Sequence, residues 1–393
     1  MDLVFTPEQD QLRAATRDLL ERHAPEPAVR AAMETEAGFD PETWQLMAQI
    51  GLQGLLVPEA YDGAGAGFVE LGIVMEELGR ALYCGPFLSS AVLGCCALLQ
   101  AGDEAVSARY LPGLGAGTSI ATIADDRLLA GDLSGSAAGE RAPVSTATSE
   151  ASGTTIDGQA AFVLDGHVAD LFIVTAHDGD ATGLYLVEAD PAHVKAAPLP
   201  TMDATRKIAT VEFRGARGRR LAAGEDADRI RRRVLDLALI ALAAEQVGGA
   251  QRMLDVAVAY AGTRVQFGRT IGSFQAVKHM CADMSVTVEA ARSAAYSGMW
   301  TAAGTVARDA ADRELAVAAA IAHSYCSEAF TQVTAASIQV HGGIGFTWEH
   351  PAHLYYRRAK SSELLFGSPA EHRRRLARLL GLRAPRPTDA TPR

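Results

Sequence analysis

The chain has 393 residues, of which 48% are hydrophobic and 21% charged, and its formal net charge is −11. That length exceeds one ordinary hydrophobic core, so two or three domains are expected. The acidic balance argues against nucleic acid or an anionic membrane surface as a partner. The first residues lack the basic and apolar regions of a signal peptide, and no apolar run approaches the roughly 20 residues that cross a bilayer. We therefore expect a soluble, cytoplasmic protein.

Helical spacing of apolar residues dominates the first part of the chain, residues 1–117. Thr6 can cap a helix whose first residue is Pro7, a position that proline suits. A stretch rich in proline and glycine, residues 57–68, is typical of a loop, and residues 68–82 have the pattern of an amphipathic helix. We predict an N-terminal helical domain over 1–117.

The character of the sequence changes at residue 118. From 118 to 220, short runs rich in β-branched residues alternate with glycine and aspartate, which is typical of a small antiparallel sheet or barrel. The polar stretch of small residues at 134–153 is expected to be a flexible surface loop. We predict a barrel-like middle β domain over 118–220.

From residue 221 to 382 the sequence is helical again, and its first helix is exceptionally long. Long helices with short connections favour an antiparallel four-helix bundle, followed by a disordered tail over 383–393. Gly248 and Gly249 each cost about 1 kcal/mol relative to alanine inside a helix, and close helix packing is the expected reason. The predicted fold is mainly α with a central β domain. The five cysteines lie in apolar, helix-like sequence and are expected to be buried, reduced thiols.

Two stretches of the last domain carry specific motifs, "TRVQFGRTIGSFQAVKHMCADM" at 263–284 and "IQVHGGIGFTWEHPAHLYYRRAK" at 338–360. Both resemble the acyl-CoA dehydrogenase family, in which the first motif has the form R-x-x-F-G-x-x-I-x-x-F-Q and the second Q-x-x-G-G-x-G-F. The matching residues are Arg264, Phe267, Gly268, Ile271, Phe274, Gln275, Gln339, Gly342, Gly343, Gly345 and Phe346. The family's order of helical, β and helical domains agrees with nearly the whole chain.

The resemblance implies FAD as cofactor, because in the family these motifs contact the ADP part of an FAD that a neighbouring subunit mainly holds. The candidate cofactor-binding residues are Arg264, Gln266, Phe267, Phe274, Gln275, Gln339, Gly342 and Gly343. An arginine fork suits a pyrophosphate, and glycines let the backbone approach an anion closely. The glutamine amides can form hydrogen bonds, and the phenylalanines offer apolar surface to the adenine side.

The catalytic base of the family is absent from both of its usual positions. Aligned on "YYRRAK", the family's Y-E-G turn here reads Leu365-Phe366-Gly367. The alternative position, on the first long helix of the bundle and about 26 residues before Arg264, is Ala238. Neither phenylalanine nor alanine can remove the α-proton of an acyl thioester.

Two carboxylates near these positions are weaker candidates for the base. Glu245 lies two helical turns past Ala238, about 10 Å along the axis, whereas a base must come within about 3 Å of its proton. Glu363 stands three residues before Phe366. A structural ion pair or a place on a helix face is expected for both, so no catalytic residue is predicted.

The middle domain also departs from the family's pattern. The family's T/S-E-x-x-x-G-S-D segment corresponds to "ATIADDRLLAGD" at 121–132, which has no clear match. Its W-I-T/S segment corresponds to "AAFVLDG" at 160–166, with Phe162 and Leu164 where tryptophan and a hydroxyl residue would stand. Leu164 has no hydroxyl to offer the flavin N5.

The motifs that reach a neighbouring subunit's ADP are present, whereas the base and the flavin-ring residues are not. In this respect the chain resembles the non-catalytic partner subunit of heteromeric acyl-CoA dehydrogenases of actinobacteria that degrade steroids and other bulky acyl-CoAs. The implied partners are an acyl-CoA thioester and a homologous subunit. Three alternatives stay open: a self-sufficient homo-oligomeric dehydrogenase with an unusual base, a non-catalytic scaffold on the same fold, and a reduced-flavin oxygenase. The sequence does not indicate the acyl group.

Two further patterns are interpreted as ordinary surface. His350 and His353, with His341 nearby, have loose spacing and no acidic ligand set, so no metal site is predicted. The basic stretch 373–383 is expected to be the solvated face of a terminal helix, with a CoA phosphate or a membrane surface as the alternative ligand.

Overall fold

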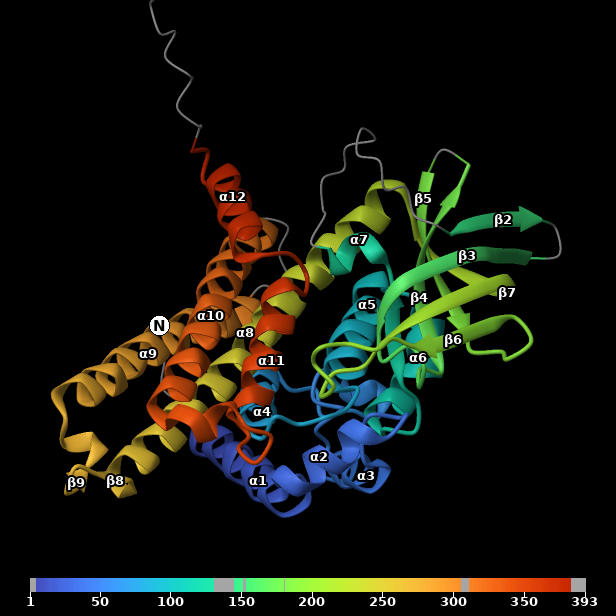
Figure 1. Cartoon of the computed structure of the whole chain (residues 1–393). Helices are drawn as coiled ribbons and strands as arrows, with labels where there is room; N and C mark the ends of the chain where they lie inside the picture. The colour runs from blue at the N-terminus through green and yellow to red at the C-terminus, as the bar shows by residue number, and fades with distance from the viewer. Residues whose placement is uncertain (1–4, 131–144, 151–152, 180, 305–310, 383–393) are drawn as a thin grey trace, which may run out of the picture.

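The structure, a computed structural model, describes residues 5–130, 145–150, 153–179, 181–304 and 311–382 (Figure 1). The chain begins with helices, as predicted. These are α1 (Pro7–His23), α2 (Glu26–Glu34), α3 (Pro41–Gln49), the 3-10 turn η1 (Glu59–Tyr61), α4 (Phe68–Arg80), the π-helix η2 (Leu88–Gly94), α5 (Cys95–Ala101) and α6 (Glu104–Gly115). Thr6 caps α1 through a reciprocal pair of hydrogen bonds with Gln9, and Pro7 is the first helical residue.

The middle of the chain forms a seven-stranded sheet. Its strands are β1 (Ala121–Ala124), β2 (Thr146–Glu150), β3 (Gly153–Leu164), β4 (Leu171–Asp178), β5 (Ala181–Glu188), β6 (Val194–Pro198) and β7 (Ile208–Ala223), with the short helix α7 (Asp126–Leu129) after β1. The pairings β4–β2–β3–β7–β5 return to β4 through the β4–β5 ladder, so the sheet closes on itself. The barrel-like form is therefore confirmed.

Two strands were not expected from the sequence. The predicted loop 134–153 contains β2, which pairs antiparallel with β3; residues 134–144 and 151–152 of that stretch lie outside the described residues. The small polar residues of β2 resemble a loop in sequence. They form a strand because their backbone pairs with β3. The strand β6 pairs with the long strand β7, whose 16 residues also reach β3 and β5.

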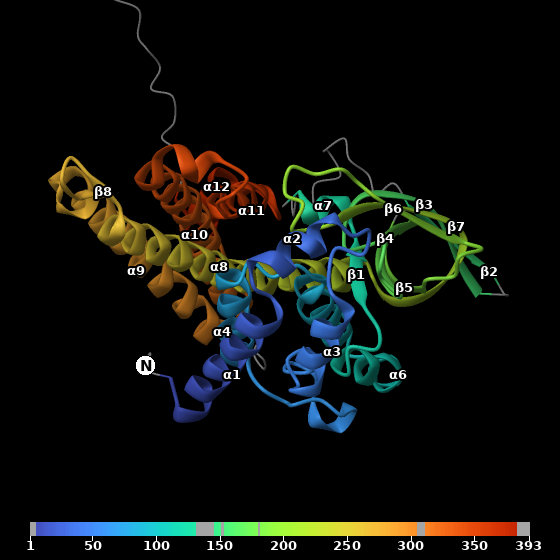
Figure 2. The same cartoon turned by 60° about the horizontal axis from the view of Figure 1, so that its bottom comes forward.

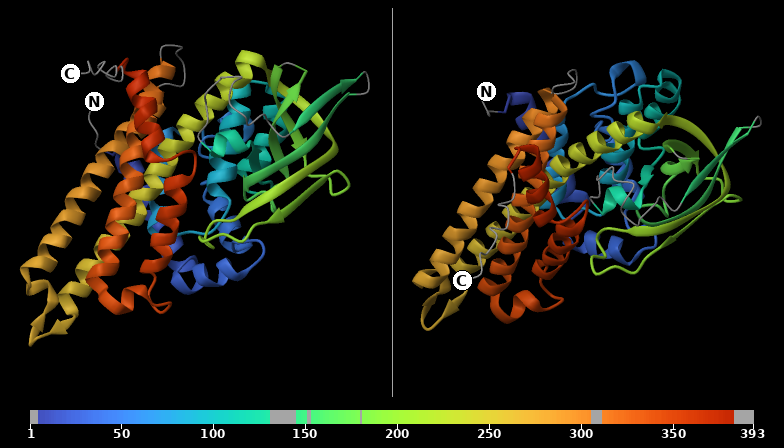
Figure 3. Two further views of the ribbon diagram at one scale, coloured as in Figure 1. Left: turned by 45° about the horizontal axis from the view of Figure 1, so that its top comes forward. Right: turned by 90° about the horizontal axis from the view of Figure 1, so that it is seen from above.

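The last part of the chain is a helical bundle (Figure 3). It consists of α8 (Gly224–Thr263), the hairpin strands β8 (Val265–Gln266) and β9 (Arg269–Thr270), the turn η3 (Ile271–Ser273), α9 (Gln275–Gly304), α10 (Ala311–His341), the turn η4 (Gly342–Phe346), α11 (Ala352–Leu364) and α12 (Pro369–Leu379). The predicted fold class, mainly α with a central β region, is confirmed. The predicted tail 383–393 lies outside the described residues.

The 40-residue helix α8 joins all parts of the molecule. It packs against α4 on one side, against α9, α10 and α11 within the bundle, and against β5 and β7 near its start. In Figure 2 the N-terminal helices lie on one side of α8 and the helices α10–α12 on the other, with the sheet at one end. The described core is therefore organised around a single helix.

Close contact between α4 and α8 explains two glycines. A Cβ at Gly248 would lie 1.8 Å from the carbonyl oxygen of Glu76, and one at Gly79 would lie 1.9 Å from that of Glu245. A Cβ at Gly249 would meet the Phe330 ring at 2.5 Å. The prediction of close helix packing is confirmed, because a Cβ at any of these three glycines would overlap an atom of a neighbouring helix.

An apolar window of 18 residues within α8 is long enough to cross a membrane by length and composition, which corrects the expectation that no run approaches that length. Burial inside the fold covers 94% of this window, as in the core helix of a folded domain. Four of the cysteines are buried and Cys281 is half-buried, all as free thiols.

Candidate functional site

The first motif forms a hairpin at the end of α8 that is distant from the sheet (Figure 1). Val265 pairs with Thr270 and Gln266 with Arg269, so Phe267 and Gly268 are the two turn residues. Both have positive φ, +52° and +75°, which is the geometry of a type I′ turn. The turn places the Phe267 ring in solvent, with 91% of its surface exposed.

Phe267 is an unusual residue for this turn. Left-handed backbone costs an ordinary L-residue roughly 1–2 kcal/mol, and asparagine or glycine would avoid much of that cost. Its ring makes an edge contact with Phe274 at 6.2 Å, and the Arg269 guanidinium lies 4.1 Å from the Phe274 ring centre. The fold therefore holds the strained, exposed Phe267 ring against Phe274, whose ring in turn faces the Arg269 cation.

The second motif lies at the end of α10 and in η4. Gly342 has φ +64°, and a Cβ at Gly342 or Gly343 would contact nothing of this chain. The packing of this chain would therefore allow a residue larger than glycine at position 343. Bare backbone at an open surface is suited to close approach by an external ligand.

A ring stack holds the two motifs at the same end of the bundle. His341, directly before Gly342, stacks on Tyr260 at 4.6 Å, and Tyr260 lies four residues before Arg264. Figure 3 shows the hairpin and the turn after α10 side by side at this end. We call the predicted residues the distal surface: Arg264, Gln266, Phe267, Phe274, Gln275, Gln339, Gly342 and Gly343.

The polar side chains of the distal surface have no partner within the described residues. Arg264 and the glutamines at 266, 275 and 339 are exposed, and their side chains form no hydrogen bond or ion pair with the described part of the chain. Exposed apolar side chains lie within or next to the same two motifs in the sequence. These are Val265, Phe267, Ile344, Phe346 and Trp348. This combination of an arginine, free amides, open glycine backbone and aromatic surface can hold a nucleotide.

The distal surface lies far from the chain's own former base positions. Ala238 and Arg264 are 26 residues apart on or next to α8, which corresponds to about 39 Å at the rise of an α-helix. The Phe366 turn contacts α7, beside the sheet, through a 2.8 Å hydrogen bond from Phe366 N–H to the Leu129 carbonyl. The two regions cannot serve the same reacting atoms within one chain.

The turn at Phe366 keeps a strained backbone but buries an apolar side chain. Phe366 has φ +64° and its side chain is fully buried. Its carbonyl bonds with the Nε2 of His372 at 2.8 Å, and the neighbouring Gly367 carbonyl bonds with the Nε2 of His323 at 3.0 Å. The turn is therefore fixed from both sides, and no carboxylate stands at it.

Glu245 is fully committed to two arginines. Its carboxylate accepts two hydrogen bonds from Arg206, at 2.5 and 2.7 Å, and one from Arg358 at 2.9 Å. Arg358 also donates to Asp203, and its remaining bonds go to Thr205 and the Tyr83 carbonyl. Although burial opposes a charge there, the carboxylates of Asp203 and Glu245 raise the pKa of Arg358. Glu245 is a structural ion-pair residue, as the sequence suggested.

The space beside this charge cluster is small. The cavity that Glu245, Arg206 and Arg358 line with Tyr83 and Leu164 has a volume of about 20 Å³. A volume of this size holds about one water molecule. An acyl chain therefore has no room in this cavity.

The strand that would face a flavin ring is occupied by the chain itself. The Asp126 carboxylate accepts hydrogen bonds from the N–H groups of Ala161, at 2.9 and 3.1 Å, and of Phe162 at 3.2 Å. Leu164 is buried, and its carbonyl accepts a 2.6 Å bond from the Thr122 hydroxyl. Buried Leu164, which has no hydroxyl, does not fit the role of a flavin-ring contact, and the Phe162 side chain is 55% exposed; the distal surface fits the ADP part of the cofactor.

The other side chains considered from sequence have structural partners. Glu363 accepts bonds from the Thr331 hydroxyl at 2.9 Å and from the Lys360 ammonium at 2.6 Å. His341 bonds with the Ser337 carbonyl at 2.7 Å. Within the described residues, no group of three or more histidine, cysteine or acidic side chains is arranged to hold a metal ion.

Comparison with known proteins agrees with this geometry. The family model for the acyl-CoA dehydrogenase N-terminal domain matches residues 6–118, and the model for the C-terminal domain of the same family matches residues 229–381. Acyl-CoA dehydrogenase IpdE2 of Mycolicibacterium smegmatis is 37% identical over 370 residues, which cover 94% of this chain and 97% of that protein. The chain belongs to the acyl-CoA dehydrogenase family. FAD is its cofactor, which confirms the sequence prediction.

Two solved structures extend the comparison to complexes of this family. The ChsE4–ChsE5 complex from Mycobacterium tuberculosis matches with a TM-score of 0.84 and 28% identity, over 98% of this chain and 100% of the matched chain. A variant of the Tcur3481–Tcur3483 steroid acyl-CoA dehydrogenase matches with a TM-score of 0.82 and 29% identity, over 95% and 98% of the two chains. Each of these two structures is named for a pair of proteins, ChsE4 with ChsE5 and Tcur3481 with Tcur3483.

The buried arginines were not found from sequence. Arg206 lies in a loop between β6 and β7, and Arg358 lies in the amphipathic helix α11, where an exposed position was equally compatible with the pattern. Their convergence on Glu245 joins three segments that are far apart in the sequence. No local signal announces such a cluster.

Proposed function

We propose that this chain is the non-catalytic subunit of a heteromeric, FAD-dependent acyl-CoA dehydrogenase. A homologous partner subunit carries the base and the flavin-ring pocket, and this chain completes the partner's FAD site with its distal surface. FAD, when bound, accepts hydride from the substrate's β-carbon. The reaction of the assembly is the α,β-desaturation of an acyl-CoA thioester.

The contrast between two regions supports this proposal. In the middle of α8 the carboxylate of Glu245 is held by Arg206 and Arg358 beside a cavity of about 20 Å³. At the distal surface, Arg264 and three glutamines are exposed and have no partner within the described chain. Polar groups inside a fold are normally bonded, whereas the exposed groups of the distal surface are available to a ligand.

Each part of the distal surface has a role in this proposal. Arg264 offers two N–H groups to a diphosphate, and the backbone at Gly342 and Gly343 can approach its oxygens. The ring of Phe267 provides apolar surface to the adenine side. In this proposal these groups act on a cofactor held by another chain, because Arg264 lies about 39 Å along α8 from Ala238.

The proposed substrate is a bulky acyl-CoA, for which a steroid side-chain thioester is the first choice. The support is that one structurally similar complex is named a steroid acyl-CoA dehydrogenase. A second support is the absence of acyl-chain space beside Glu245, since one lost acyl site per pair leaves more room for a large substrate in the other. Under this proposal the assembly acts in the cytoplasm.

The deciding experiment compares the purified chain with the chain co-expressed with a homologous subunit that has the glutamate of the Y-E-G turn. We expect weak flavin absorbance and no dye reduction by acyl-CoA for the chain alone, and a stable flavin spectrum with turnover for the pair. Stoichiometric FAD and turnover in the isolated chain would refute the proposal.

Variants distinguish a hidden base from a missing one. If this chain by itself turned over an acyl-CoA with Glu245 or Glu363 as its base, Glu245→Gln or Glu363→Gln would abolish that turnover. We expect Glu363→Gln to leave turnover of the pair intact, because the partner subunit carries the base. Phe366→Glu in the isolated chain should produce no turnover, because the cavity beside Glu245 lacks acyl-chain space; recovered activity would show that only the base had been lost.

A further inference from the structure

A cavity larger than the one beside Glu245 lies where the N-terminal helices meet the bundle. It has a volume of about 270 Å³, and its lining comes from α1, α2, the end of α4, α8 and the start of α11. We call it the junction cavity. Sites for drug-sized molecules have roughly 300–1,000 Å³, so the junction cavity has room for a smaller organic molecule.

The floor of the junction cavity is apolar. Five of its lining side chains are no more than 5% exposed and belong to the hydrophobic interior of the chain. These are Leu20, Val29, Leu82, Leu354 and Tyr355. Covering apolar surface of this kind with an apolar group is favourable, because it removes that surface from water.

Leu82 is a costly residue for its position in this floor. It follows the last turn of α4 with φ +53°, at a place where the end of a helix usually has glycine. A bulky residue with positive φ is an outlier, and such strain occurs at ligand sites more often than elsewhere. The strained backbone places a leucine side chain on the wall of the cavity.

Most charged side chains at the rim of the junction cavity are held in ion pairs within the chain. The pairs are Arg17 with Glu77, Arg80 with Asp255 and Glu26 with Arg30. The bond to Glu77 raises the pKa of Arg17, and the nearby carboxylate of Glu21 adds to that effect. These charges balance one another and offer little to a ligand.

Arg252 on α8 is different. It lines the cavity and is exposed, and it forms no ion pair within the part of the chain that the structure describes. Its guanidinium lies near the Tyr355 hydroxyl, which donates to the Arg80 carbonyl at 2.6 Å. Burial raises the pKa of this hydroxyl to about 12, and the Arg252 cation opposes the shift. An unpaired cation therefore lies at the edge of an apolar floor.

We propose that the junction cavity binds a small organic carboxylate. The apolar chain of the ligand covers the floor, and its carboxylate accepts hydrogen bonds from Arg252, whose planar fork matches the two oxygens of a carboxylate. The ligand is short, because about 270 Å³ is below the range of drug-sized molecules. This site does not rest on the proposed function, since none of its lining residues belongs to the distal surface.

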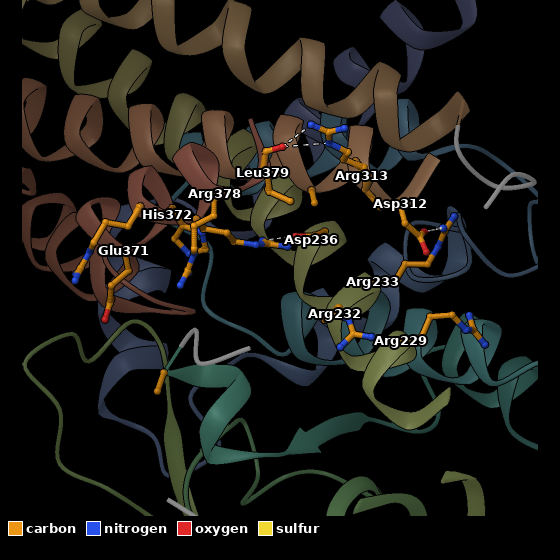
Figure 4. Close-up of a pocket in the computed structure, with 15 residues that line it drawn as sticks. Arg229, Arg232, Arg233, Asp236, Asp312, Arg313, Glu371, His372, Arg378 and Leu379 are labelled. Carbon is orange, nitrogen blue, oxygen red and sulfur yellow. Dashed lines mark hydrogen bonds and ion pairs between the residues drawn. The ribbon is translucent and has the colours of Figure 1, made fainter. Parts of the chain in front are cut away.

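The chain offers a matched control for Arg252 in another cavity. Arginines from α8, α10 and α12 surround a cavity of about 620 Å³ at the first turns of α8 (Figure 4). Arg232 lies on its α8 side and, like Arg252, is exposed and has no ion pair among the described residues. The two arginines are on the same helix but line different cavities, so equivalent changes at them separate the junction cavity from general attraction of an anion.

The test measures binding to the full chain by calorimetry at fixed salt, with octanoate, octanol, octylammonium and acetate as probes. We expect octanoate to bind at least tenfold more tightly than octanol, which lacks the charge, and than acetate, which lacks the chain. Octylammonium should bind no more tightly than octanol. If octanoate binds no more tightly than octanol, octylammonium or acetate, the proposal is overturned.

The variant Arg252→Ala removes an exposed side chain without an ion pair, so it should fold normally and reduce the affinity for octanoate to that for octanol. Arg232→Ala should leave the octanoate affinity unchanged. Unchanged octanoate binding in Arg252→Ala, or a loss confined to Arg232→Ala, would overturn the proposal. Flavin content of the assembly depends on the distal surface and should be the same in both variants, which separates this test from that of the proposed function.

Discussion

The interior around Glu245 and the distal surface contain the same kinds of residue in opposite states. In the interior, Arg206 and the buried Arg358 both donate to Glu245, and Arg358 also donates to backbone carbonyls. At the distal surface, Arg264 is exposed and has no partner within the described chain. The comparison shows that residue type alone does not reveal the role of an arginine. An arginine already bonded within the chain stabilises the fold, whereas an exposed arginine without a partner is available to a ligand.

The largest expected effect is a loss of folding stability when the ion-pair cluster around Glu245 is broken. Arg358→Met leaves Glu245 and Asp203 buried with fewer partners, and loss of one member of a buried ion pair costs about 3–5 kcal/mol. Chemical denaturation should show a loss of this size in the free energy of unfolding. Arg22→Ala, which removes an exposed ion pair with Asp18, is the control and should cost at most about 1 kcal/mol. Equal losses in the two variants would contradict the structural role of the cluster.

The next effect concerns ligand affinity at the distal surface. Arg264→Ala should leave the free energy of unfolding within about 0.5 kcal/mol of the parent, because an exposed side chain without a partner is lost. Removal of a charge-assisted hydrogen bond costs about 1.5–3 kcal/mol, so FAD should bind the heteromeric assembly roughly 10- to 150-fold more weakly. Flavin release on dilution measures this. A stability loss without a flavin loss would place Arg264 in the fold instead.

The interior should also give the protein a pH-dependent stability. Burial, followed by the nearby His372, lowers the pKa of His323 from its ordinary 6.5 to about 3. A depressed pKa in the folded state means that the stabilisation is complete above pH 6.5 and is lost as the pH falls towards 3. The slope from one proton is at most about 1.4 kcal/mol per pH unit.

The variant His323→Gln isolates this group, since glutamine can still donate to the Gly367 carbonyl that His323 bonds at 3.0 Å. The free energy of unfolding of the variant, measured by urea titration between pH 6.5 and 4, should fall with a smaller slope than in the parent. Identical slopes would show that His323 does not titrate in this range.

The smallest expected effect is a change in stability at Phe267, which tests whether the distal surface keeps a strained residue for ligand binding. Its φ of +52° is a position that asparagine adopts more readily, so Phe267→Asn should raise the free energy of unfolding by about 0.5–1 kcal/mol. The same change should weaken FAD binding by the assembly, because the exposed ring is lost. A variant that gains stability and keeps its FAD affinity would show that the strained ring has no role in binding.

Much of the fold was predictable because its signals are local. Thr6 and Pro7 announce the start of α1, the glycines at 248 and 249 announce a close helix contact, and the hairpin motif lies within a few residues. The strand β2 was missed because its small polar residues resemble a loop, and only the ladder with β3 makes them a strand. The division into domains at 117/118 and 220/221 stays a prediction.

The sequence by itself determined the family, the cofactor and the absence of a glutamate at both usual positions of the base, since motif spacing and residue identity are local properties of the chain. Only the tertiary structure decided that Glu245 is held by Arg206 and Arg358 beside a cavity of about 20 Å³, and that arginines from α8, α10 and α12 surround one of about 620 Å³. The physical reason is that charge commitment and empty volume depend on segments far apart in the sequence, which only folding brings together.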